Sequence, residues 1–239
     1  MQRAAHVAIA LLAIVPLGAS LATAAGVLPA TPMLPPMIVT VAAASDVPAS
    51  LVSMTLAETE AIWRRAGFTF IWQRVSLDAW PLDTPPRPAS LRVVIGRNQR
   101  TAADGTLPLG WIVFDDVTTP EQEVYVSYAS AVRFLDTAGS AVGPIHSMPR
   151  LQRETLMARA MGRVLAHEIG HYLLASKAHS AHGLMKAVQT AVELFSPDRT
   201  RFIVEPSQMT AVAARVASLQ PAVPAAVPMV TPRYRGGVQ

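Results

Sequence analysis

The chain has 239 residues, of which 51% are hydrophobic and 15% are charged, with a net charge of +4. This length predicts one domain with short appendages, and the composition is sufficient for a sizeable buried core. The small net charge and the scattered arginines argue against a nucleic-acid-binding surface. There is no cysteine, which excludes disulfides and thiolate ligands, so any metal must be bound through His, Asp, Glu or the backbone.

The N-terminus has the pattern of an export signal. Arg3 precedes an apolar run over residues 7–17, and residues 22–24 read Ala-Thr-Ala, a small-x-small cleavage pattern. The run is too short to span a membrane comfortably and contains Pro16, which favours a cleaved signal peptide over an uncleaved anchor. We therefore expect residues 1–24 to be removed, and the mature protein to be secreted or periplasmic, with no stable membrane insertion.

Both ends of the remaining chain are rich in proline. Residues 25–36 predict a Pro-rich lead-in, and residues 219–239 predict a disordered Pro/Ala-rich tail, because regularly placed prolines prevent a helix. The folded body is then expected over residues 37–218.

The first half of this body predicts a strand, a helix and four more strands. The β-branched run at 37–41 predicts the first strand. An apolar face with Leu51, Ile62 and Trp63 predicts a helix over 48–66, which Gly67 should end. The remaining strands are predicted at 68–75, 91–95, 111–114 and 124–128.

The second half is predicted to be mainly helical. A loop around Gly139, Gly143 and Pro144 should lead to a long helix, which begins near Ser147 and Pro149 and ends at Leu174 or Ala175. An irregular segment and a last helix over 206–219 follow. The order of these strands and helices predicts an α+β fold in which one sheet is backed by helices.

The long helix carries the sequence His-Glu-Ile-Gly-His at residues 167–171. His167 and His171 lie one turn apart on the same face, so their imidazoles can bind one tetrahedral ion. Glu168 can reach a water held at that ion without being a ligand, which suits a general base. The neighbouring residues are mostly apolar, so the helix should be buried, which argues against a plain surface pair of histidines. Zinc is the expected metal.

This pattern resembles the metzincin zinc metallopeptidases, especially the small matrixin-like domains, whose signature is HExxHxxGxxH followed by a Met-turn. The resemblance rests on His167, Glu168, His171, the pair His179-Ser180 and the triplet 183–185, Gly-Leu-Met. It extends more loosely to the order of elements. It implies a twisted, mostly parallel sheet of about five strands, a long active-site helix and a small lower subdomain. It also implies an endopeptidase with Met185 beneath the zinc.

The chain departs from the family signature directly after the helix. Leu174 stands where the family has its helix-ending glycine, and Lys177 stands where the family has its third histidine. A protonated lysine has no lone pair for a metal. A two-residue insertion with Ala175 and Ser176 at the bend would bring His179 to the site instead.

Two other residues remain alternatives for the third ligand. His182 directly precedes the 183–185 turn, and it could also close the site as a fourth ligand of a structural zinc. Glu193 lies 22 residues after His171, where a peptidase of the Glu-liganded class would supply its ligand from a second helix. His179 is preferred because it needs only a turn after His171 and is followed by Ser180, as in the matrixin-like pattern.

The resemblance also implies the substrate and the way in which it binds. The family binds polypeptides extended along an upper edge strand, and residues 111–114 are the candidate for that strand, with an ordinary core strand as the alternative. We expect the exported protein to be active once it has folded and bound zinc, or to be restrained by a separate protein inhibitor. The competing function is an exported binding module with a structural zinc and no turnover.

Overall fold

The computed structural model describes residues 34–77, 90–101 and 107–219, all of which belong to one compact unit. The predicted signal peptide, residues 25–33 of the lead-in and residues 220–239 of the tail lie outside these described residues. Within the described part of the chain, no helix is long and apolar enough to cross a membrane.

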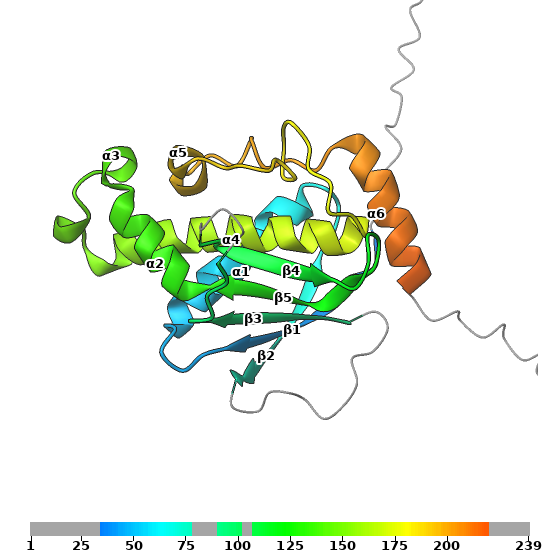
Figure 1. Cartoon of the computed structure of the whole chain (residues 1–239), viewed down its shortest axis with the longest axis horizontal. Coiled ribbons are helices and arrows are strands. Elements are labelled where there is room, and N and C mark those ends of the chain that lie inside the picture. The colour runs from blue at the N-terminus through cyan, green and yellow to red at the C-terminus, as the bar shows by residue number, and fades with distance from the viewer. Residues whose placement is uncertain (1–33, 78–89, 102–106, 220–239) are drawn as a thin grey trace, which may run out of the picture. The chain divides into compact units, whose positions relative to one another are not determined.

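A five-stranded sheet and the helices that cover it form the body (Figure 1). The strands lie in the order β2-β1-β3-β5-β4, and all neighbours are parallel except β4 and β5. The predicted mostly parallel sheet backed by helices is therefore confirmed. The strands are β1 (Met37–Ala43), β2 (Phe70–Ser76), β3 (Ser90–Gly96), β4 (Gly110–Phe114) and β5 (Pro120–Ser127).

The main helices occur close to the predicted positions. The bounds are α1 (Ala49–Arg64), α2 (Tyr128–Thr137), α3 (Gly139–Val142), α4 (Arg150–Leu174), α5 (Ala191–Phe195) and α6 (Pro206–Leu219). Gly67 has φ +76°, the left-handed conformation that glycine adopts readily, and it lies in the turn that follows α1 as predicted. The predicted loop before α4 is wrong in part, because α2 and α3 occupy much of it. The strand predicted to end at Tyr128 ends at Ser127, where α2 begins.

The core lies between one face of the sheet and the paired helices α1 and α4. Val39, Val41 and Val93 are at most 1% exposed and belong to one buried cluster with residues of both helices. Two hydrogen bonds join the helices: the Thr59 hydroxyl donates to Gly162 O at 2.9 Å, and the Trp63 indole donates to Ala166 O at 3.2 Å. The long helix is therefore buried along most of its length, as its apolar composition predicted.

Strand β4 is an edge of the sheet and lies beside α4. A Cβ atom at Gly110 would fall 2.5 Å from Cγ1 of Val164 and 3.0 Å from the Tyr125 carbonyl oxygen. Only a glycine allows the strand to begin this close to the helix. The prediction that residues 111–114 form an edge strand is confirmed. After α4 the chain returns along the helix, on the side away from β2 (Figure 1).

Candidate metal centre

The two histidines of α4 face each other one helical turn apart. Their ring centroids are 4.6 Å apart and their Nε2 atoms are 3.0 Å apart. His171 is only 6% exposed, and His167 is partly buried. The i, i+4 spacing on a regular helix produces this juxtaposition, as the sequence predicted.

Each of these rings is oriented by a backbone carbonyl. His167 Nδ1 lies 2.8 Å from Leu184 O, and His171 Nδ1 lies 2.7 Å from Ser176 O. A carbonyl oxygen can only accept, so each Nδ1 carries the proton and each Nε2 keeps its lone pair. A second partner of this kind is typical of metal-binding histidines, because it fixes the tautomer and the ring orientation.

The electrostatic setting keeps both rings neutral. Burial lowers the pKa of His167 to about 4, although its hydrogen bond to Leu184 opposes this shift. Burial also lowers the pKa of His171, and the hydrogen bond to Ser176 again opposes it. Since a metal ligand must be deprotonated, both rings are ready for coordination at neutral pH without first losing a proton.

The chain bends sharply where α4 ends. Ala175 has φ 48° and ψ 43°, and it is the one non-glycine residue of the described chain with positive φ. Its N–H and that of Ser176 donate to Tyr172 O and His171 O, both at 3.3 Å. The predicted bend at residues 175 and 176 is confirmed, and it places the Ser176 carbonyl on the His171 ring.

This bend brings His179 back to the helix. Its ring centroid lies 5.3 Å from that of His167 and 4.9 Å from that of His171. One nitrogen from each ring lies within 4.8 Å of the others, the only such group of three potential ligands in the part of the chain that the structure describes. The structure therefore brings together the three histidines that the sequence proposed. That they bind zinc stays a prediction.

The donor set fits a zinc ion. Two nitrogen lone pairs that face each other at 3.0 Å repel unless a cation lies against both. In a tetrahedral zinc site with bonds of about 2.0–2.1 Å, two ligand nitrogens lie about 3.4 Å apart. Three imidazoles with one open position match the ligand set of a catalytic zinc rather than that of a closed structural site.

The loop over residues 180–186 keeps His182 out of this group and packs Met185 against α4 at Gly170. The Ser180 N–H donates to Met185 O at 2.8 Å, which closes the loop on itself. His182 is exposed and lines a separate hollow. Met185 is 1% exposed, and a Cβ atom at Gly170 would collide with its Sδ atom. Met185 thus packs directly against α4 between the levels of the two helix histidines.

Glu193 is engaged away from the three histidines. Its carboxylate accepts from the Thr190 N–H at 2.8 Å and from Lys186 Nζ at 2.9 Å, and it also pairs with Arg201 at 3.3 Å. The Thr190 hydroxyl accepts from the Glu193 N–H, which completes a capping box at the start of α5. The alternative ligand is therefore not brought to the site, and its side chain instead fixes a helix end.

Glu168 lies at the floor of the cleft, next to the edge strand. It is 8% exposed, and burial raises its pKa to about 8, while the backbone N–H of Ile112 donates to the carboxylate and opposes this shift. A dication at the neighbouring histidines would favour the ionised form. The carboxylate thus lies beside strand β4 and lines the same hollow as the three histidines.

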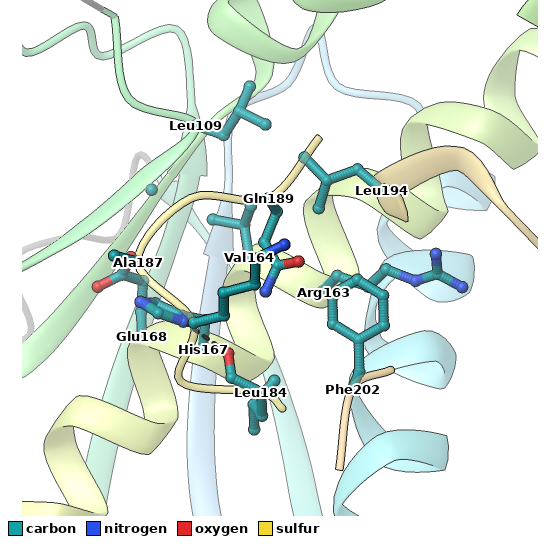
Figure 2. A pocket seen from close by; sticks show the side chains of 12 residues that line it. Leu109, Arg163, Val164, His167, Glu168, Leu184, Ala187, Gln189, Leu194 and Phe202 are labelled. Carbon is teal, nitrogen blue, oxygen red and sulfur yellow. Dashed lines mark hydrogen bonds between the residues drawn. The ribbon is translucent and has the colours of Figure 1, made fainter. Parts of the chain in front are cut away.

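Two hollows meet at this group. The first, of about 180 Å³, has mainly apolar walls, and we call it the apolar hollow (Figure 2). Its apolar side chains are Leu109, Val164, Leu184, Leu194 and Phe202, and its polar ones are His167, Glu168, Arg163, Lys186 and Gln189. The second, of about 440 Å³, runs along β4 and is lined by the whole strand, by Glu168 and by all three histidines. We call this second hollow the β4 cleft.

The sequence interpretation missed several residues that shape this region. Leu109, Leu194 and Phe202 line the apolar hollow, yet they come from three separate segments without periodicity. Arg163 also lines it, and it lies four residues before His167, hence on the same helix face. That spacing was the one signal that could have identified Arg163.

The comparisons with known proteins found similarity to solved structures. No model of a known protein family and no curated protein matches the chain. The chain is similar to the crystal structure of archaemetzincin from Methanopyrus kandleri, with 14% sequence identity and a TM-score of 0.48. The match covers 76% of this chain and 96% of that chain.

Proposed function

We propose that this chain is an exported zinc-dependent endopeptidase of metzincin-like, matrixin-like type. One observation supports this most strongly: three histidine rings converge on one point beside an open cleft that follows an edge strand. The ligand set leaves one position free for water or substrate, as in catalytic zinc sites. The cleft offers the exposed edge of β4 to an extended peptide.

His167, His171 and His179 would hold the zinc, and when bound the ion supplies a Lewis acid that polarises a peptide carbonyl and acidifies a water. Glu168 would take up a proton at its carboxylate and deliver it to the leaving amine. Its hydrogen bond to the Ile112 N–H keeps the carboxylate at the cleft floor. Met185 would support the helix from below without binding the ion.

The strand edge and the apolar hollow would bind the polypeptide. Outward-facing backbone groups of β4 would pair with the extended chain, which supplies affinity without sequence preference. The apolar hollow of about 180 Å³ would accept one hydrophobic side chain next to the cleaved bond. Nothing in this arrangement requires a nucleic acid, and a separate protein inhibitor could occupy the same cleft.

Zinc retention tests the site directly. The wild-type protein should keep one zinc equivalent after dialysis, and His179→Ala should lose it, because the removal of one of three ligands weakens binding sharply. His182→Ala is the matched control, since it removes a histidine three residues away that lies outside the group. If His179→Ala keeps its zinc and His182→Ala loses it, the proposed ligand set is wrong.

Peptide hydrolysis with and without a chelator tests the chemistry. We expect cleavage that the chelator abolishes and that added zinc restores. Glu168→Gln should keep zinc but lose about 10²–10⁴-fold in kcat/KM, the usual contribution of general acid–base catalysis. Zinc binding without hydrolysis of any peptide would instead favour an exported binding module with a structural zinc.

A further inference from the structure

The β4 cleft changes character along its length. At the Gly110 end it adjoins the apolar hollow, and at the Phe114 end its wall includes Lys177; Arg100 lines the same cleft. Among the described residues that line the cleft, Glu168 is the only carboxylate, and it is buried beside Ile112. Phe114 is two residues further along the strand, about 7 Å away. Among the described residues of the cleft wall, the charge at the Phe114 end is therefore that of Lys177.

The bend after α4 places Lys177 at this end. The left-handed Ala175 turns the chain back toward the sheet, and Lys177 reaches across to β4, where its Nζ atom lies 5.1 Å from the centroid of the Phe114 ring. A cation over an aromatic face is favourable, so this contact keeps the ammonium group at the cleft wall. Lys177 itself is exposed and hence accessible to a bound molecule.

Neither cation is neutralised by the described residues. In the described ranges, no carboxylate lies within ion-pair distance of Lys177 or Arg100, whereas other arginines and Lys186 are paired. Asp115 and Asp116 follow the strand but do not line the cleft, and the Asp116 carboxylate accepts from the N–H groups of Thr118 and Thr119. A negative charge in the cleft would therefore find two cations that have no carboxylate partner among the described residues.

We propose that the β4 cleft selects polypeptides with an acidic side chain before the cleaved bond. This inference rests on the proposed function, because it concerns the substrate of the same site. An antiparallel ladder is more stable than a parallel one, so the peptide should run opposite to β4. Its residues before the cleaved bond then lie at the Phe114 end. The acidic residue should be about two positions before that bond.

A set of matched peptides tests this selection. Starting from a neutral peptide that the protein cleaves, we would place Glu, Gln or Lys two residues before the cleaved bond, and Glu two residues after it. The kcat/KM of the Glu peptide should be about fivefold higher than that of the Gln peptide, mainly because its KM is lower, since the carboxylate meets the cleft cations when the peptide binds. The preference should shrink as salt is raised from 0.05 to 0.5 M, roughly, because exposed charges are screened.

Variants at one position identify the cause. Lys177→Gln should reduce the Glu-over-Gln ratio to about twofold, and Lys177→Glu should invert it in favour of the Lys peptide. Arg133→Gln is the matched control: it removes one positive charge from α2, outside the cleft, and should leave the ratio at about fivefold. An equal rate for the Glu and Gln peptides, or a ratio unchanged in Lys177→Glu, overturns the inference.

A binding measurement separates this inference from the proposed function. Fluorescence anisotropy of the labelled peptides with the zinc-loaded Glu168→Gln protein reports affinity without turnover. If no peptide is cleaved but the Glu peptide binds more tightly in a Lys177-dependent way, the selection stands and the proposed function fails. If peptides are cleaved without a charge preference, the function stands and the selection fails.

Discussion

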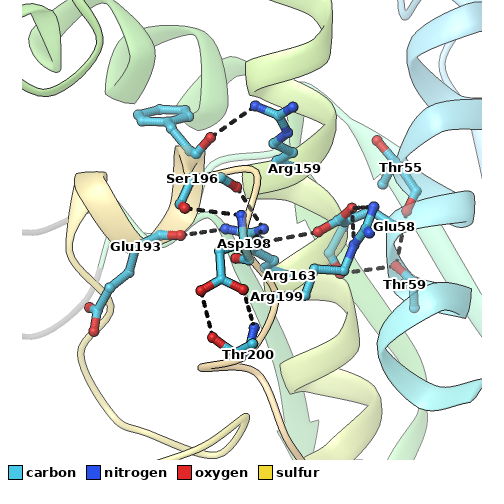
Figure 3. Close-up of polar contacts among 12 residues, drawn as sticks. Thr55, Glu58, Thr59, Arg159, Arg163, Glu193, Ser196, Asp198, Arg199 and Thr200 are labelled. Atoms are coloured by element: carbon cyan, nitrogen blue, oxygen red, sulfur yellow. Dashed lines mark hydrogen bonds and ion pairs between the residues drawn. The ribbon is translucent and has the colours of Figure 1, made fainter. Parts of the chain in front are cut away.

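Arg163 joins the long helix to the segment that returns over it. It lies on α4 one turn before His167 and is 1% exposed. Its guanidinium donates to Glu58 at 3.0 Å, to Ser196 O at 2.7 Å, to Asp198 O at 3.0 Å and to Glu193 O (Figure 3). We expect Arg163→Met to destabilise the fold strongly.

The magnitude follows from what each partner loses. Glu58 keeps its ion pair with Arg199 at 2.6 Å, so the carboxylate is not left without a cation. Three backbone carbonyls lose their charged donor: the bond to Glu193 O is buried, and those to Ser196 O and Asp198 O are partly buried. A buried group left unsatisfied costs about 1–3 kcal/mol, and a partly buried one costs less because water can reach it. The buried guanidinium no longer has to be desolvated, which offsets part of this loss. The net reduction in the free energy of unfolding should be about 3–4 kcal/mol, close to the usual cost of breaking a buried pair.

Urea unfolding followed by circular dichroism measures this difference, and a thermal scan should show a Tm lower by about 10 °C for a domain of this size. Arg159→Met is the matched control. Arg159 lies on the same helix one turn earlier, but it makes a single bond to the returning segment, to Phe195 O at 3.1 Å, and its loss should cost only about 1 kcal/mol. If the two variants are equally destabilised, the multiple bonding of Arg163 does not stabilise the fold as argued.

Two further predictions concern stability. The hydrogen bonds from Thr190 and Lys186 lower the pKa of Glu193 from 4.5 to about 2, so the stabilisation by its carboxylate should be complete above pH 4.5 and be lost as the pH falls toward 2. The wild-type protein should therefore exceed Glu193→Gln in unfolding free energy by about 1–2 kcal/mol at pH 7. If this difference does not narrow between pH 5 and pH 2, the predicted direction of the pH dependence is wrong. A Cβ atom at Gly162 would lie 2.7 Å from Thr55 O, so Gly162→Ala should lower the unfolding free energy by about 1–3 kcal/mol, although alanine has the better helix propensity. Gly139→Ala is the control, because Gly139 has open space around it and its substitution should change the unfolding free energy little. Similar values for the two variants would argue against close contact of α1 and α4.

Local patterns predicted most of the elements. The long helix was expected to begin near Pro149 and end at Leu174 or Ala175, and it spans Arg150–Leu174. Its periodicity and its terminal signals lie within the segment itself, so no knowledge of the partners was needed. The same holds for the convergence of His167 and His171, which helical geometry alone determines.

The helix α2 was missed although its signals are local. Ser127 accepts a hydrogen bond from the Ser130 N–H as an N-cap, and Ala131 and Leu135 form a buried i, i+4 pair. The preceding β-rich residues led the strand interpretation one residue too far, to Tyr128. The element boundary was therefore lost where a strand passes directly into a helix without a loop.

Tertiary contacts were beyond the reach of such patterns. The carbonyl groups that accept from Arg163 belong to residues 193–198, which are 30 to 35 residues further along the chain and show no periodic pattern. The Leu184 carbonyl that orients His167 is 17 residues away. Backbone acceptors carry no residue-type signal, since every residue has one. The sequence therefore could not predict these carbonyl partners, although it did predict the position of the His167 side chain that one of them orients.

The third histidine shows why spacing within a motif is less transferable than the motif itself. A residue on a helix is placed by the helical period, but a residue after the helix is placed by the point at which the helix ends. Here α4 continues through Leu174, and Ala175 takes the left-handed conformation at a cost of about 1–2 kcal/mol that glycine would avoid. The same turn supplies the Ser176 carbonyl to His171 and directs Lys177 to Phe114. The longer helix therefore brings His179, and not residue 177, to the two helix histidines, and it leaves the Lys177 ammonium group at the cleft.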